Sequence, residues 1–335
     1  MTSARPLTAL AEAQAALLAL LAPVAPRQIA CGEAVGLIAA ELAPLQTPWP
    51  ARAFALRAGY ALRSVDLAGA SSFSPALLAS APTRVGVGDA LPDGCDCVVE
   101  PAALDLSGPM PQALVESYPG ENIRRAAEDF PAGAIVIASG RRITALDVML
   151  ASRVGFESLP VRRPRVAILG DASAFLMQQA QQVGAEVVAP DAAADLVILA
   201  GEPLDAITWR VQGVALEPGR DCGFGFVRGA PAIALPPTSD QMFAGWMALV
   251  RPALDRLAAR QRPAPLALPL CAKISSRVGL AELALLKESD GMFTPLAVGD
   301  CPMQFFSLAT HATLIGAASE GHAAGEICAA DPLDA

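Results

Sequence analysis

Histidine is nearly absent from this 335-residue sequence, which contains only His311 and His322. Histidine is the general base of the common catalytic triads and a frequent zinc ligand, so two isolated histidines make both kinds of site improbable. Basic residues are also in deficit, with 24 Lys and Arg against 33 Asp and Glu and a net charge of -9. This balance argues against nucleic acid as the main partner.

The chain has no cysteine pattern typical of a metal site. Its seven cysteines form an odd, scattered set, and Cys95 and Cys97 are separated by a single residue, which matches no zinc-ligand spacing. We therefore expect buried free thiols in a protein of the reducing cytoplasm. Cys222 is expected to be a core thiol.

No apolar run is suited to crossing a membrane, although the mean hydropathy is positive. The strongest candidate, "LTALAEAQAALLALLAPVA", carries Glu12 and Gln14 and reaches Pro23 too early to span a bilayer. It also lacks a preceding basic region, which excludes a signal peptide. Its Ala and Leu spacing predicts an amphipathic helix that ends before Pro23.

The length and composition predict several hydrophobic cores. A chain of 335 residues with 53% hydrophobic residues, 29 Pro and 27 Gly is typical of a compact, loop-rich protein with more than one domain. We predict a fold that combines α/β and β domains in four parts. These are a helical linker domain (1–45 plus 145–163), a β-rich domain (46–144), an α/β domain (164–262) and a C-terminal β domain (263–335).

Local signals support these divisions. Val98-Val99, Val115 and the run 135–137 are typical strand residues, and Thr144 is positioned as the N-cap of a helix. Between residues 164 and 260, the runs "RPRVAILG", "AEVVAP", "ADLVILAG" and "APAIALPP" predict strands that alternate with helices. Continuous apolar strands joined through helices indicate a doubly wound parallel sheet, which binds ligands at the carboxyl ends of its strands.

The segment "PGENIRRAAEDFPAGAIVIASGRRIT" concentrates arginine in an otherwise acidic protein. Further arginine pairs follow at 141–142 and 162–163. One interpretation is that Arg124 and Arg125 bind a phosphate or a sulfur-rich anion through charge-assisted hydrogen bonds. The other is that these arginines pair with Glu128, Asp129 and Asp147 and stiffen the local structure.

Several segments occur in one order: "LPDGCDCVVE", "PGENIRRAAEDFPAG", "SGRRIT", "RVGFESLPVRRPRVAIL", "PGRDCGFG" and "FFSLATHATLIG". Together they resemble the molybdopterin molybdenumtransferase family, the MoeA-type molybdenum insertases related to the gephyrin E-domain, from roughly residue 7 to 333. The resemblance implies an elongated four-part subunit with a molybdopterin-binding α/β domain. It also implies a homodimer whose sites lie between the α/β domain of one chain and the β-rich domain of the other.

The same resemblance implies a reaction and its ligands. Family members take adenylated molybdopterin and molybdate, cleave the adenylate and leave molybdenum on the dithiolene sulfurs. That reaction depends on magnesium and on acidic residues. The resemblance places Gly59, Tyr60, Arg124, Arg125, Asp171, Gly201, Gly219, Arg220, Thr238 and Ser239 in the cofactor-binding region.

In the β-rich domain, the sequence departs from the family pattern at two loops. The family has Asp-Gly-Tyr-Ala where this chain has Ala58-Gly59-Tyr60-Ala61, and Thr-Gly where it has Val87-Gly88. Alanine can neither coordinate a metal nor accept a proton, and valine has no hydroxyl group.

The α/β domain departs further. "LGDASA" keeps Asp171, the remaining candidate metal ligand, but has Ala172 where the family has Glu. A glycine-rich phosphate loop is replaced by "AGEPLD", in which Glu202 adds negative charge and Pro203 removes an amide donor. A Lys-Pro-Gly-Lys-Pro run is "EPGRD", and Pro-Gly-Asn-Pro is "PPTS", with Pro237 in place of Gly.

These departures predict a catalytically degraded paralogue in the molybdenum cofactor pathway. It would bind molybdopterin or the finished cofactor, or dock on a molybdoenzyme or a true insertase, as a cytoplasmic homodimer. The alternative is an active transferase that uses magnesium and molybdate, and a third possibility is a dimeric scaffold without a pterin ligand. Asp171 and Asp66 are the acids expected to act if metal binding persists.

Overall fold

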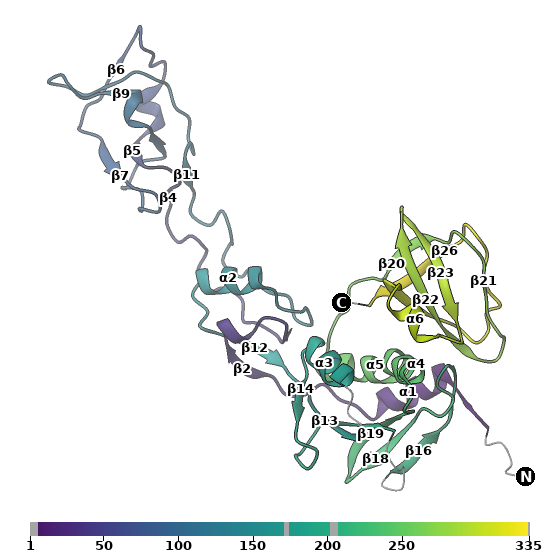
Figure 1. Ribbon diagram of the computed structural model, residues 1–335. Helices are drawn as coiled ribbons and strands as arrows, with labels where there is room; N and C mark the ends of the chain where they lie inside the picture. The colour runs from purple at the N-terminus through teal and green to yellow at the C-terminus, as the bar shows by residue number, and fades with distance from the viewer. Residues whose placement is uncertain (1–5, 171–173, 202–206, 334–335) are drawn as a thin grey trace, which may run out of the picture. The chain divides into compact units, whose positions relative to one another are not determined.

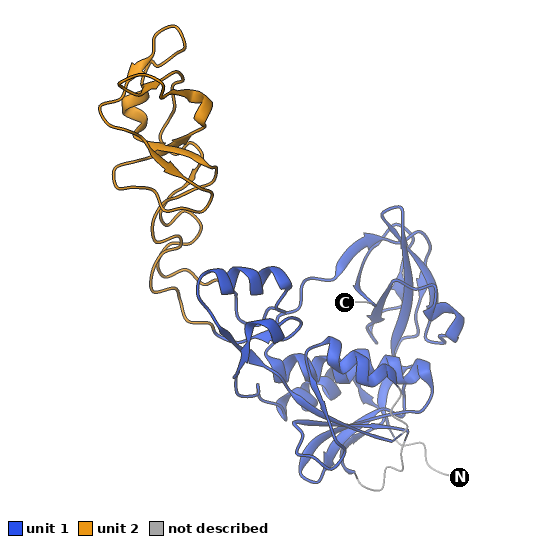
Figure 2. Ribbon diagram, turned by 60° about the vertical axis from the view of Figure 1, so that its left-hand side comes forward, with its two compact units in different colours: residues 1–41, 137–335 blue, residues 42–136 orange. Residues whose placement is uncertain are grey.

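The computed structural model describes residues 6–170, 174–201 and 207–333. The chain falls into two compact units, one of residues 1–41 and 137–335 and the other of residues 42–136 (Figure 2). This division has fewer parts than the four predicted domains, whose boundaries stay a prediction.

The first unit contains a six-stranded sheet in the order β14-β13-β15-β19-β18-β16. Strands β14, β13, β15 and β19 are parallel, whereas β18 and β16 run antiparallel to their neighbours. The bounds are β13 Arg165–Gly170, β14 Glu186–Val188, β15 Leu196–Ala200, β16 Thr208–Gln212, β18 Gly223–Val227 and β19 Ala230–Leu235. The apolar runs of the sequence thus form the predicted parallel strands.

Helices pack on one face of this sheet (Figure 1). They are α1 Leu10–Ala19, α3 Ala174–Gln182 and a long helix made of α4 Ser239–Gly245, a π-helical turn Trp246–Val250 and α5 Arg251–Ala258. Alternate residues of the strands, such as Val166 and Ile168, face the helices, because side chains of a strand alternate between its faces. Trp246 is almost fully buried there, as expected of a core residue.

The C-terminal part of this unit belongs to a second sheet, in the order β1-β17-β22-β24-β26-β20, with β23 paired to β22. The bounds are β1 Thr8–Ala9, β17 Val214–Glu217, β20 Leu266–Pro269, β22 Ala281–Ser289, β23 Met292–Val298, β24 His311–Ile315 and β26 Ile327–Pro332. A short helix, α6 Met303–Phe306, and the pair β21 Ile274–Ser275 and β25 Gly321–His322 complete this part. Its separate core includes Leu270, Phe293 and Ile315.

A small three-stranded sheet of the first unit has the order β2-β12-β3. Its bounds are β2 Arg27–Ala30, β3 Ile38–Ala39 and β12 Ser158–Arg162. Helix α2, Ala145–Arg153, precedes β12, and its N-cap is Thr144, as predicted. Thr144 and Asp147 form a reciprocal capping box, which satisfies two otherwise free amides of the first turn.

The second unit is β-rich and has two small cores. Its sheets have the orders β7-β5-β8, β6-β10-β9 and β11-β4. The bounds are β4 Phe54–Ala55, β5 Gly59–Leu62, β6 Ala76–Leu77, β7 Thr83–Val85, β8 Cys97–Val99, β9 Leu104–Asp105, β10 Gln112–Ala113 and β11 Ile123–Arg124. Val98-Val99 lies in β8, as predicted.

Two expectations about local structure are wrong. The expected helical character of residues 1–45 is wrong, because α1 is the only α-helix among the described residues 6–45, and residues 27–30 and 38–39 are strands. The apolar face of α1 is too small to form a core alone, so it packs into the α/β core, where Gln14 donates to the carbonyl of Ala248 at 2.7 Å. Val115 and the run 135–137 are loop residues, since neither segment has a strand to pair with.

Among the described residues, no helix has the length and the hydropathy that crossing a bilayer requires.

Candidate functional site

An apolar pocket of about 370 Å³ opens at the carboxyl ends of the parallel strands, where the fold was expected to bind a ligand. Its described lining consists of Phe175, Ala200, Pro237, Ser239, Met242, Phe243, Met303 and Phe306. Phe243 lies between two other rings, 6.1 Å from Phe175 and 5.2 Å from Phe306 between ring centroids. No lysine, arginine, aspartate or glutamate belongs to this described lining.

The ends of β15 and β19 approach each other closely beside this pocket. Gly201 has a positive φ of 70°, and a Cβ atom there would lie 2.9 Å from the Cβ of Pro237. Gly201 is therefore required by the close packing of Pro237, and no other role is needed to explain it. Thr238 and Ser239 are exposed at the start of α4, where Thr238 is the N-cap residue but makes no capping bond through its side chain. Only Ser239 of this pair lines the pocket.

In the turn that follows β17, the single arginine is paired with the carboxylate at the end of that strand. The resemblance placed Arg220 in the cofactor-binding region, but its guanidinium pairs with the carboxylate of Glu217. Glu217 is also opposite Glu282 in the parallel pairing of β17 with β22. Gly219 is buried between Leu216 and Cys222 with a φ of 120°, so it is needed by the turn. This turn offers an anion no unpaired positive charge.

Negative charge is also present close to the pocket. Burial, together with the nearby carboxylates of Asp240 and Asp300, raises the pKa of the Cys301 thiol to about 12. Asp240 follows the pocket residue Ser239, and Cys301 precedes Met303 by two residues. The field in this region therefore disfavours a phosphate group.

Four of the positions named from the sequence lie outside the described residues: Asp171, Ala172, Glu202 and Pro203. In the described part of the chain, no group of three or more His, Cys, Asp or Glu residues is arranged to hold a metal ion. Magnesium prefers carboxylate and water oxygens, and the described lining of the pocket supplies no carboxylate. The described residues thus do not fit the magnesium that the family resemblance implies.

In the second unit, Ala58 and Val87 lie at the same end of a strand pair. Strand β5 pairs antiparallel with β7, with Gly59 opposite Val85, so the residue before β5 and the loop after β7 are neighbours. Both side chains are exposed, and neither is polar. The two altered positions are therefore neighbours, but neither side chain supplies an acid or a hydroxyl. The acids at this end are Asp89, which accepts from the amide of Gly86 at 2.7 Å, and Glu100, which pairs with Arg57 at 2.9 Å.

Gly59 and Tyr60 have structural surroundings. A Cβ atom on Gly59 would lie 2.1 Å from the carbonyl oxygen of Val99, so only glycine allows β5 and β8 to pair here. Tyr60 packs against the hydrophobic cluster that contains Leu62. Asp66 lies beyond the opposite end of β5, where the guanidinium of Arg63 lowers the pKa of its carboxyl group through a hydrogen bond.

The arginines of the segment 120–129 are engaged locally. Arg124 forms ion pairs of 3.4 Å with both Glu128 and Asp129. The guanidinium of Arg125 donates to the carbonyl oxygen of Pro119 at 2.6 Å, and its backbone amide donates to Glu128. Arg141 pairs with Asp147 in the same way. These contacts agree with the interpretation that the arginines stiffen the structure.

The cysteines are free thiols, as expected, and five of the seven are buried. Cys222 lies in the α/β core, where burial raises the pKa of its thiol to about 12. It is a core thiol, as the sequence predicted.

Sequence reasoning missed the aromatic and methionine lining of the pocket. Phe175, Met242 and Phe243 lie on α3 and α4, and Met303 and Phe306 come from α6, at least 60 residues later in the chain. The signal that was available is the apolar cluster "MQFF" in a segment expected to contain only strands and turns.

Comparisons with known proteins agree with this fold. The family model of the MoeA N-terminal region (domain I and II) matches residues 8–155. Molybdopterin molybdenumtransferase 2 of Mycobacterium tuberculosis is 25% identical over 268 residues, which cover 58% of this chain and 66% of that protein. Molybdopterin molybdenumtransferase of Synechococcus elongatus is 31% identical over 176 residues, which cover 38% of this chain and 42% of that protein. The chain is therefore matched to less than two thirds of each relative's length.

Solved structures extend the likeness to nearly the whole chain. The molybdopterin biosynthesis MoeA protein from Pyrococcus horikoshii OT3 has a TM-score of 0.76 at 21% identity, with 96% of this chain and 98% of that chain covered. A molybdenum cofactor biosynthesis protein from Pyrococcus furiosus has a TM-score of 0.63 at 17% identity, with 97% and 99% covered. Residues 8–155 thus match the MoeA N-terminal region, and nearly the whole chain has the fold of the solved MoeA structures.

Proposed function

We propose that this chain acts in molybdenum cofactor biosynthesis as a MoeA-family protein that does not insert molybdenum. Its role would be to bind molybdopterin or the cofactor, or to dock on a partner such as a molybdoenzyme or a true insertase. We further propose that it is a cytoplasmic homodimer, as the family resemblance implies.

The observation that carries this proposal is the chemistry of the pocket at the carboxyl edge. Its described lining is formed by aromatic, methionine and small side chains, with Ser239 as the single hydroxyl. Apolar and aromatic walls suit a flat ring, whereas a phosphate group is bound most strongly by cationic side chains, and this described lining contains none. The pocket therefore favours retention of a ligand over cleavage of its adenylate.

The positions expected to carry the reaction support the same conclusion. Ala58 and Val87 supply neither a carboxylate nor a hydroxyl, and Arg220 is paired with Glu217. General acid or base catalysis and charge stabilisation both require groups that these positions lack. An active transferase would need acids from positions outside this set, and Asp171 is the first candidate.

The deciding experiment is incubation of the purified full-length protein with adenylated molybdopterin, molybdate and magnesium. Hydrolysis of the adenylate is followed in the same samples as ligand binding. We expect binding without hydrolysis, which would identify a carrier. Molybdate-dependent hydrolysis would overturn the proposal in favour of the active transferase. Absence of both would leave only the docking role.

A further inference from the structure

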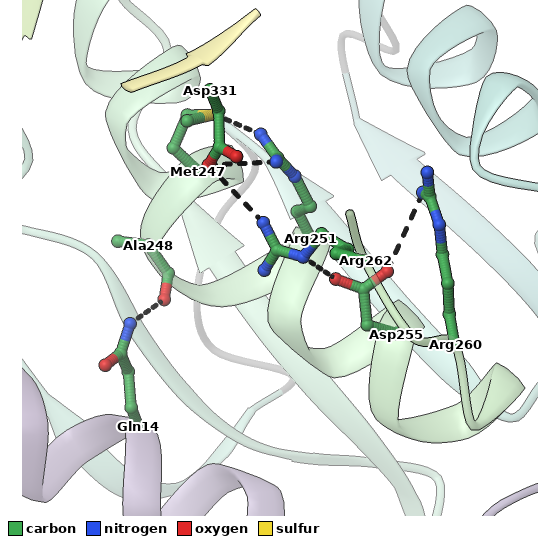
Figure 3. A network of polar contacts seen from close by, with 8 residues as sticks. All are labelled: Gln14, Met247, Ala248, Arg251, Asp255, Arg260, Arg262 and Asp331. Atoms are coloured by element: carbon green, nitrogen blue, oxygen red, sulfur yellow. Dashed lines mark hydrogen bonds and ion pairs between the residues drawn. The ribbon is translucent and has the colours of Figure 1, made fainter. Parts of the chain in front are cut away.

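A chain of five charged side chains connects α5, the linker that follows it and the last strand of the first unit (Figure 3). Arg251 and Arg262 both approach Oδ2 of Asp331, at 2.9 and 3.5 Å. Arg262 also approaches Asp255 through its Nε at 2.6 Å, and Arg260 lies 3.8 Å from the same carboxylate. The order Arg251–Asp331–Arg262–Asp255–Arg260 thus begins and ends with an arginine.

This cluster of five side chains carries an uncompensated positive charge. Three arginines against two aspartates leave an excess of one charge. The terminal arginines are nearly buried, since the side chains of Arg251 and Arg260 are only 11% and 8% exposed. Burial of a charge without a partner is costly, so the cluster as it stands would be stabilised by an additional anion.

The charges around Arg251 and Arg260 agree with an excess of positive charge in the cluster. Burial lowers the pKa of Arg260, and the charge of Arg142 lowers it further, while Asp255 opposes both effects. Burial and the charge of Arg262 likewise lower the pKa of Arg251. Arg142 therefore adds a fourth positive charge near the cluster without adding a carboxylate.

The cluster borders a cavity of about 320 Å³ that is separate from the apolar pocket. The described walls contain all three arginines, His311 and a single carboxylate, that of Asp331; the remaining lining is Pro263, Ala264, Pro265, Leu266, Ala267 and Pro332. Asp255 pairs with Arg260 and Arg262 but is not part of the lining of the cavity. The cavity thus presents more positive than negative charge to whatever enters it.

We propose that this cavity binds the phosphate group of a small phosphate monoester through Arg251, Arg260 and Arg262. A tetrahedral phosphate has enough oxygens to accept from three guanidinium groups, whereas a carboxylate has two. The walls of the cavity carry three arginines and one aspartate, an excess of two positive charges, which the roughly −2 charge of a phosphate monoester matches better than a monovalent anion does. The volume lies at the lower end of small-molecule sites, so it has room for a short organic group beside the phosphate.

The test is isothermal titration calorimetry of the full-length protein with glycerol phosphate, inorganic phosphate and acetate in a buffer free of other oxyanions. We expect glycerol phosphate to bind at least as tightly as inorganic phosphate and far more tightly than acetate. The proposal would be overturned if neither phosphate bound, if acetate bound as tightly as the phosphates, or if inorganic phosphate bound and glycerol phosphate did not.

Two variants change the charge of the cavity in opposite directions. Arg260→Gln removes one positive charge and should weaken glycerol phosphate binding at least about tenfold, whereas Asp331→Asn removes the wall carboxylate and should tighten it. Arg63→Gln, which removes an exposed arginine that is also paired with an aspartate, is the matched control and should leave binding unchanged. If both cavity variants weaken binding alike, or neither changes it, the arginines serve only as a structural connection.

A measurement on the unaltered protein covers the case in which a variant fails to fold. Phenylglyoxal modifies accessible guanidinium groups, and peptide mass spectrometry locates the modified arginines. We expect glycerol phosphate to protect Arg260 and Arg262 and to leave Arg63 unprotected. Equal modification of the cavity arginines with and without the monoester would overturn the proposal.

Discussion

At position 58, an exposed alanine stands at the end of β5 where the family pattern has an aspartate. The neighbouring loop has Val87 where the family has threonine, and its Asp89 accepts from the amide of Gly86 at 2.7 Å. A carboxylate restored at position 58 alone would therefore still lack the other groups that the family pattern has at the altered loops. Groups that work as a set in catalysis lose most of their effect when one partner is missing, so partial repair brings little back.

We accordingly expect Ala58→Asp to leave molybdate-dependent hydrolysis of adenylated molybdopterin at the level of the unaltered protein. Ala58→Asn, which has the same shape without the charge, is the control. Appreciable turnover by Ala58→Asp alone, and not by Ala58→Asn, would show that the remaining machinery is intact and would contradict the proposed function.

Gly59 is a residue whose identity is fixed by backbone packing. A methyl group there would lie 2.1 Å from the carbonyl oxygen of Val99, so Gly59→Ala must push β5 and β8 apart. We expect a loss of about 1–3 kcal/mol in the free energy of unfolding, as for other overpacked sites. Urea denaturation followed by circular dichroism measures it.

Gly32→Ala is the matched control, because nothing lies within 4 Å of a Cβ atom built there. We expect that change to shift the free energy of unfolding by less than about 0.5 kcal/mol. Equal effects of the two substitutions would show that the pairing of β5 with β8 tolerates a side chain at position 59.

At the scale of the element, the first residue of helix α2 is fixed by capping hydrogen bonds of two side chains, and not by the apolar face of the helix. The Thr144 hydroxyl accepts from the amide of Asp147 at 3.2 Å, and the Asp147 carboxylate accepts from the amide of Thr144 at 2.8 Å. Asp147 is almost fully buried and also pairs with Arg141. The cap therefore connects the helix to the segment that precedes it.

Thr144→Ala should lower the free energy of unfolding by about 0.5–2 kcal/mol, because it leaves the amide of Asp147 without its acceptor. Thr144→Ser keeps the hydroxyl and should retain most of the stability. Urea denaturation of the three proteins provides the comparison, and a serine variant as unstable as the alanine variant would contradict a capping role.

The strands of the parallel sheet were predictable, whereas several elements nearby were not. A strand with a continuous apolar run, such as 165–170 or 196–200, is stable only when both of its faces are buried. Such a run can therefore be identified in the sequence as a strand of a covered sheet. Strand β2 is half-polar and β3 has only two residues, and both exist because β12 lies between them. Pairing with a distant segment leaves no periodic pattern in the sequence.

At the scale of the whole molecule, three buried thiols link stability to alkaline pH. Burial raises the pKa of Cys97 to about 11 and those of Cys222 and Cys301 to about 12. In the unfolded chain these thiols lose their protons near pH 8.5. Between these values the folded protein binds more protons, so the free energy of unfolding falls as the pH rises.

We therefore expect the urea midpoint to be lower at about pH 10.5 than at about pH 8. Cys222→Ala should make this dependence on pH shallower, because it removes the most deeply buried of the three thiols, even though the packing defect lowers stability at both pH values. A variant with the same pH dependence as the unaltered protein would contradict a contribution from Cys222.

The sequence by itself indicated the resemblance to the MoeA family, and it determined the α/β and β character of the main parts, the N-cap of α2 and the buried state of Cys222. These depend on local patterns: apolar runs, capping residues and the order of segments. It also indicated the altered loops at Ala58, Val87 and Pro237, since a missing carboxylate or glycine is visible in the letters alone.

Only the tertiary structure decided which charges remain available and what surrounds the ligand pocket. Arg124, Arg125 and Arg220 are engaged by nearby groups, while Arg251, Arg260 and Arg262 line a cavity with an excess of positive charge. Phe175 and Phe306 both line the pocket at the carboxyl edge, although they come from segments far apart in the chain. The physical reason is that charge compensation and pocket chemistry depend on distances across the fold, which neither composition nor spacing contains.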